Sequence, residues 1–145
     1  MSTSLWSPQR GDLSFPGLGS ATLTNPNGTI DGMTVSASKL TLDSGTKTAT
    51  AASGAATLNK MAGVVTSEAL TTAAGATYTL TLTNSSVAAA DQVFASVNLG
   101  AGTGGMPTVC QVTPAAGSVV IVVQNVHASA AFNAAIKIIF MVVKN

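Results

Sequence analysis

The chain has 145 residues, of which 46% are hydrophobic and only 8% charged, and its formal net charge is +1. Six scattered basic residues form no basic stripe, which excludes a dedicated nucleic-acid binder. Disordered chains combine low hydrophobicity with high charge, whereas this chain has high hydrophobicity and low charge. The longest apolar runs, Val119–Val123 and Ile138–Val143, are far short of the roughly 20 residues that span a bilayer.

Soluble domains usually contain about 25% charged residues. A chain with so few charges therefore keeps its surface wet with neutral Thr, Ser and Asn side chains, or has much of that surface covered by partners. We expect the second arrangement.

Residues 1–27 are predicted to form an extended N-terminal arm. Three of the five prolines lie here among several glycines, so neither a helical nor a strand period persists. A solvated linker has no need of large apolar side chains, yet the arm contains Leu5, Trp6, Leu13, Phe15 and Leu18. We expect these anchors to dock on a neighbouring subunit or scaffold, or else to fold back on their own domain.

Residues 28–54 are predicted to form a short β segment. The stretch from Thr29 to Ser36 alternates with the period of a strand, and its apolar series contains Ile30, Met33 and Val35. Strands with such small side chains cannot build a core alone. We expect them to pair with copies in other chains around a symmetry axis, or to pack on the C-terminal domain. A homo-oligomer, with a trimer favoured, follows from the first arrangement.

Residues 55–145 are predicted to form an all-β sandwich of the jelly-roll or Greek-key kind, because six short apolar stretches are separated by turn-forming clusters. In the cleanest one, Tyr78, Leu80 and Leu82 face one side and four threonines the other. Val119–Val123 is apolar on both faces, which predicts a central or an interface strand. The expected strands are Gly63–Ala69, Ala76–Thr83, Gln92–Leu99, Thr108–Thr113, Ser118–Val126 and Ala134–Val143.

Catalytic chemistry is hard to assemble from these residues. The single histidine, His127, is predicted to lie in a loop, and one His, one Cys and five dispersed carboxylates make no recognisable zinc set. A triad of His127 with Asp91 or Asp12 lacks a nucleophile elbow. We expect no enzyme, no cofactor, no metal and no small-molecule substrate; a small hydrolase that uses His127 is the least favoured reading.

Three further patterns are given structural readings. Cys110, within a predicted strand, is expected to be a small buried residue. The glycine loop Gly100–Gly105 lacks the ending of a phosphate loop, so we expect a flexible hairpin connection. The few aromatic residues, Phe94 among them, are interpreted as core residues rather than as a sugar-binding platform.

Two stretches resemble a known group of proteins. The sequence from Asn27 to Val35 (NGTIDGMTV) resembles a motif of trimeric fibre and collar-like modules of tailed bacteriophages. The sequence from Ala56 through Leu70 to Asn84 resembles the start of small β domains of phage virion proteins, and Val112–Val122 fits the same picture. The resemblance covers roughly residues 27–125 and implies a virion structural protein without catalytic residues.

The leading hypothesis is therefore a capsid decoration (cement) protein on the outer surface of a bacteriophage head. It would bridge subunits of the major capsid protein without contacting nucleic acid or membrane. Its expected interface residues are Leu5, Trp6, Leu13, Phe15, Leu18, Ile30, Met33 and Val35. The alternative is a tail-fibre, head-fibre or receptor-binding module that attaches to a host surface through the loop at Gly100–Gly105 or at Asn84–Ala90.

Overall fold

The computed structural model describes residues 46–145. The predictions for the arm and for the short β segment fall mostly on other residues. All eight expected interface residues lie outside the described residues, as does Asp12: Leu5, Trp6, Leu13, Phe15, Leu18, Ile30, Met33 and Val35.

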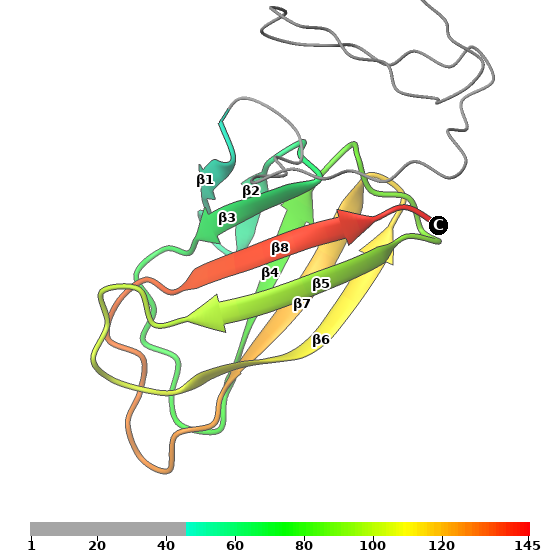
Figure 1. Ribbon diagram of the computed structural model, residues 1–145. Helices are drawn as coiled ribbons and strands as arrows, with labels where there is room; N and C mark the ends of the chain where they lie inside the picture. The colour runs from blue at the N-terminus through cyan, green and yellow to red at the C-terminus, as the bar shows by residue number, and fades with distance from the viewer. Residues whose placement is uncertain (1–45) are drawn as a thin grey trace, which may run out of the picture. The chain divides into compact units, whose positions relative to one another are not determined.

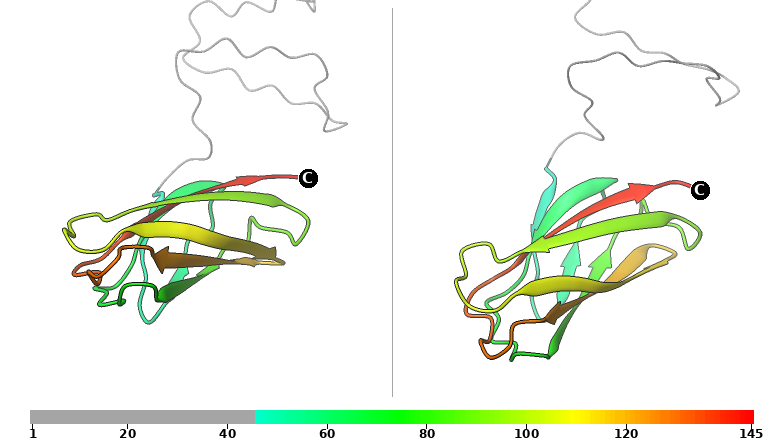
Figure 2. Two further views of the ribbon diagram at one scale, coloured as in Figure 1. Left: turned by 90° about the horizontal axis from the view of Figure 1, so that it is seen from below. Right: turned by 60° about the horizontal axis from the view of Figure 1, so that its bottom comes forward.

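The described chain is an all-β sandwich of two four-stranded mixed sheets, seen as two layers in Figure 2. One sheet has the strand order β1-β3-β8-β5 and the other β2-β4-β7-β6 (Figure 1). No helix within residues 46–145 is long and apolar enough to cross a bilayer. The strands are β1 (Thr48–Thr50), β2 (Ala55–Thr57), β3 (Ala62–Thr66), β4 (Thr77–Thr83), β5 (Gln92–Asn98), β6 (Pro107–Ala115), β7 (Ser118–Asn125) and β8 (Lys137–Val143).

Three strands of each sheet are antiparallel to their neighbours, whereas β1 and β2 add in parallel at one edge of each sheet. The chain crosses from β1 to β2 through a tight turn in which Gly54 has a φ of +73°. A Cβ on Gly54 would lie 2.7 Å from the Thr79 carbonyl oxygen, so this position favours glycine for space as well as for conformation. Within residues 28–54, Thr48–Thr50 thus packs on β3 of its own chain.

The core lies between the sheets and follows the strand alternation predicted from sequence. Tyr78, Leu80 and Leu82 of β4 are buried, as expected, while the intervening threonines are exposed. Val119–Val123 belongs to β7, which lies between β4 and β6, and the prediction of a central strand is confirmed. Opposite them, β8 contributes Ile138, Phe140 and Val142 to the core.

The prediction that Cys110 is buried is wrong, because β6 contains a β-bulge at this residue. Val109 pairs with Val123 and Gln111 with Val122, so Cys110 is the extra residue of the bulge. Its side chain is exposed, and its thiol donates a hydrogen bond to the Val122 carbonyl at 3.3 Å. The bulge shifts the alternation by one residue, which allows both Val109 and Val112 to pack against the core.

Candidate interaction surface

The outer face of the β1-β3-β8-β5 sheet is apolar although it does not face the core. Ile139, Met141 and Val143 of β8 point outward and are 40%, 38% and 43% exposed, and Phe94 of β5 is 60% exposed. Val64 of β3 is half-buried beside them. We call these five residues the apolar face.

The strand register explains why these side chains meet. Met141 pairs with Ala62 on one side and with Phe94 on the other, while Ile139 pairs with Val64 and Ser96. Directly paired side chains on one face of a sheet lie within contact distance. The apolar face therefore runs without interruption across three strands. At one end of this face, Lys137 of β8 pairs with Thr66 and Asn98 and adds a charge.

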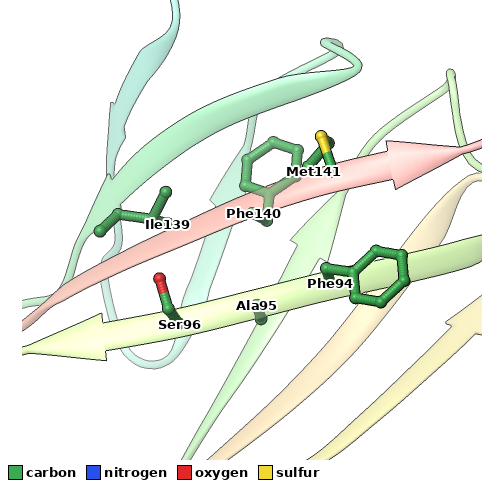
Figure 3. A pocket seen from close by; sticks show the side chains of 6 residues that line it. All are labelled: Phe94, Ala95, Ser96, Ile139, Phe140 and Met141. Atoms are coloured by element: carbon green, nitrogen blue, oxygen red, sulfur yellow. The ribbon is translucent and has the colours of Figure 1, made fainter.

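A shallow hollow of about 200 Å³ lies on the apolar face between β5 and β8 (Figure 3). Phe94 and Met141 stand at one end and Ser96 and Ile139 at the other. The Ala95–Phe140 pair lies between them, and its side chains turn toward the core. Sites for small ligands usually have roughly 300–1,000 Å³. The hollow suits one large side chain of a partner better than a cofactor.

The apolar face reaches the edge of its sheet at β5, and β6 of the other sheet lies along the free side of this strand. Beyond its pairing with β8, β5 makes no backbone hydrogen bond to other described residues. It contains no proline, no charge and no bulge, which are the usual means of protecting an edge strand. By contrast β6, the corresponding edge strand of the other sheet, has a bulge and includes Pro107 and Pro114. Because β6 lies along this edge, the apolar face rather than the edge is the surface that favours contact with another chain.

The outer face of the β2-β4-β7-β6 sheet is different, and we call it the threonine face. Val120 and Val122 of β7 point outward here, but both are half-buried. Val122 lies between Thr79 and Gln111, and Val120 lies between Thr81 and Thr113. Polar and β-branched neighbours thus cover the two valines and keep this face wet without charge.

The sequence-based interpretation missed the apolar face. Phe94 was expected to be a core residue, and the structure shows that this is wrong: its neighbours Val93 and Ala95 turn inward, and the strand alternation turns Phe94 outward. One signal for this face was present. Ile138–Val143 is apolar at every position, as Val119–Val123 is, and such a run predicts a strand with both faces covered.

His127 lies in a loop, as predicted. Its Nδ1 accepts hydrogen bonds from the backbone N–H groups of Ser129 at 3.1 Å and Ala130 at 2.8 Å. Asp91 lies at the opposite end of the sandwich, where its carboxylate forms an ion pair with Lys144 at 2.6 Å. The pairing of His127 with Asp91 that a hydrolase would need is therefore not formed. Within residues 46–145, no three His, Cys, Asp or Glu side chains form a group that could hold a metal ion.

The most strongly shifted pKa in the described chain belongs to Tyr78, and its environment is structural. The Tyr78 hydroxyl donates to Glu68 Oε2 at 3.0 Å, and Glu68 Oε1 accepts the N–H of Gly54 at 2.9 Å. Burial first, and then the hydrogen bond and the charge of Glu68, raise the pKa of Tyr78 far above its usual value. Glu68 thus ties the turn after β1 to the start of β4.

The two loops considered for host attachment lie at opposite ends of the sandwich, because one precedes β5 and the other follows it. The prediction that the glycine loop is a hairpin connection is wrong, because the loop joins β5 to β6 in the other sheet. Asn133 Oδ1 accepts the N–H groups of Thr103 and Gly104, both at 3.0 Å, and so holds this loop. The other loop is held by Asn84, which is fully buried and donates to the Lys60 carbonyl at 2.7 Å. No single contact surface includes both loops.

Comparison of the chain with protein-family models, with curated proteins and with solved structures finds no match.

Proposed function

We propose that this protein is a non-catalytic structural subunit that bridges other subunits of a larger assembly through its apolar face. The exposure of Phe94, Ile139 and Met141 on one continuous sheet face is the observation that carries this proposal. Contiguous exposed apolar patches bordered by polar residues mark interaction sites on soluble proteins.

The assembly that we propose is a bacteriophage head, with the protein as a decoration or cement subunit on its outer surface. The resemblance of residues 27–125 to phage virion modules supports this choice, as does a chain with only 8% charged residues. The partners would be the major capsid protein and further copies of this chain, with a trimer as the expected oligomer.

The proposed role is mechanical. Covering apolar surface contributes about 25 cal/mol per Å², and this free energy opposes the separation of capsid subunits. Attachment through several copies makes dissociation slow, because one contact re-forms while the others hold.

A receptor-binding module is the second candidate, and one observation favours the glycine-loop end for it. Met106 and Val126 are 54% and 45% exposed, and the N–H of Val126 donates to the Met106 carbonyl at 2.9 Å. They form a small apolar patch beside the glycine loop. Binding of the purified protein to host cells, lost on Met106→Ser, would favour this candidate.

The test of the bridging role is a matched pair of variants. Phe94→Lys and Thr108→Lys each place a lysine at an exposed, outward position of an edge strand, the first on the apolar face and the second on the threonine face. We expect Phe94→Lys to dissociate the oligomer in light scattering and Thr108→Lys to leave it intact. A wild-type protein that stays monomeric at every concentration would contradict self-assembly.

The capsid role has its own test. Particles prepared without the protein are expected to release DNA at a lower temperature, and added wild-type protein, but not Phe94→Lys, should restore the wild-type temperature. Unchanged release in its absence would contradict a cement role.

A further inference from the structure

We infer that Trp6, in the arm of a neighbouring copy, occupies the hollow of the apolar face between Phe94 and Met141. This inference rests on the proposed function, since it names the partner of the same surface.

The described chain begins beside the apolar face. It enters the sandwich through β1, which is the edge strand of the sheet that carries this face. The N–H of Val64, a residue of the apolar face, donates to the Lys47 carbonyl at 2.8 Å. The 45 preceding residues therefore join the sandwich at the sheet whose outer surface is apolar.

The preceding chain is long enough to reach another copy. Trp6 and Thr46 are 40 residues apart. At a maximal rise of about 3.3 Å per residue, this length spans up to roughly 130 Å. A four-stranded sheet is only about 20 Å wide at its usual strand spacing. Covalent length thus allows the arm to cross its own sandwich and to reach the next one.

The hollow matches the chemistry of an indole ring. An aromatic ring and a thioether form one end of it, and both pack favourably against aromatic side chains. A buried indole also needs an acceptor for its N–H. The exposed Ser96 hydroxyl at the other end makes no hydrogen bond to other described residues and can supply that acceptor. Trp6 is the only tryptophan of a chain that contains few aromatic residues.

The experiment uses Trp6 as its own reporter in the full-length oligomer. Because the chain has a single tryptophan, all of its indole fluorescence comes from the arm. We expect blue-shifted emission and acrylamide quenching several-fold weaker than that of a peptide of residues 1–12. Phe94→Lys should restore peptide-like emission and quenching, whereas Thr108→Lys should not. Circular dichroism and the thermal midpoint report whether each variant keeps the sandwich, and Ile139→Thr offers a milder change at the same hollow.

A double-mutant cycle measures the contact itself. Trp6→Ala alone is expected to weaken self-association by about tenfold or more, as a central aromatic anchor does. The second variant of the cycle is Phe94→Ala, which truncates the ring without adding a charge. In the Phe94→Ala background, Trp6→Ala should add little, because the two residues act in one contact.

The outcomes separate this inference from the proposed function. Free quenching of Trp6 in the wild-type oligomer overturns the inference, but the apolar face remains the interface if Phe94→Lys still dissociates the protein. A sheltered Trp6 in a monomeric protein places the arm on its own chain, which overturns both. Additive effects in the cycle overturn the contact between Trp6 and Phe94.

Discussion

The two sheets of the sandwich have similar apolar inner faces, but their outer faces differ in polarity. On the threonine face, Val120 and Val122 of the central strand β7 lie between polar neighbours on β4 and β6. On the apolar face, Ile139 and Met141 of the central strand β8 lie beside Val64 and Phe94. Both central strands are apolar runs, so the difference comes from the flanking strands. Neighbours across the sheet decide whether an outward apolar residue is covered or offered to a partner.

Substitutions on the inner and outer sides of β8 are expected to differ most strongly in their effect on stability. Phe140→Ala removes a buried ring from β8, and we expect it to lower the free energy of unfolding by about 3–5 kcal/mol. Met141→Ala, one residue further along, points outward and should cost about 0.5 kcal/mol or less in the dissociated protein. Urea denaturation of both variants at several protein concentrations measures this.

The concentration dependence sharpens the contrast. The proposed interface covers Met141 in the oligomer, so the effect of Met141→Ala should grow with protein concentration. The effect of Phe140→Ala should stay constant. An equally large cost for Met141→Ala at low concentration would mean that this side chain is covered within its own chain.

An intermediate effect concerns the end of β8, where the apolar face is held in place. Asp91 accepts hydrogen bonds from Lys144 at 2.6 Å and from the Ala88 N–H at 2.7 Å. The Lys144 contact foremost lowers the pKa of Asp91 below its usual value of 3.8. The folded state thus stabilises the ionised form of Asp91 more than the unfolded state does. This stabilisation is present above the unfolded pKa and is lost as the pH falls through the lower folded pKa.

We therefore expect faster amide exchange at Val142 and Val143, relative to the intrinsic rate at the same pH, as the pH falls below about 4, where a free aspartate becomes protonated. Asp91→Asn should reproduce that exchange at neutral pH and lower the thermal midpoint less than Phe140→Ala does. Lys144→Met is the matched change on the other side of the ion pair. Exchange at β8 that does not respond to pH or to Asp91→Asn would contradict a role for this ion pair.

Single substitutions on the threonine face are expected to change the free energy of unfolding least. Thr79→Val and Thr81→Val should each change the free energy of unfolding by about 0.5 kcal/mol or less, since both side chains are exposed and valine also suits a strand. Together they remove the polar cover of Val122 and Val120. We expect the double variant to acquire a second association mode, visible as aggregates larger than the wild-type oligomer. Unchanged light scattering would show that threonine is not needed to keep this face free.

The sequence predicted a large part of the fold because strand alternation is local. The period of two in Thr77–Thr83 correctly placed Tyr78, Leu80 and Leu82 in the core. All six expected strands exist, although β3 and β8 are shorter than expected. Beyond their ends the pairing continues through Ser67, whose hydroxyl accepts the N–H of Ile136 at 3.0 Å.

Other features depended on pairing between distant residues, which a single sequence does not display. The bulge at Cys110 depends on the register between β6 and β7, and it turned an expected core residue outward. To place Phe94 on the apolar face, one must know which residues of β5 point inward. One must also know that Phe94 pairs with Met141, which is 47 residues away in the chain. The expected interface residues of the arm and of the short β segment, among them Trp6 and Ile30, remain predictions.

Local patterns in the chain are enough to predict a sparsely charged all-β protein whose inner residues recur with period two. Hydrophobic periodicity acts over a few residues and is written in the chain. Which of the two outer faces is left apolar cannot be predicted from such local patterns. That outcome depends on which strands become neighbours, and a surface patch exists only after β3, β5 and β8 have been brought together.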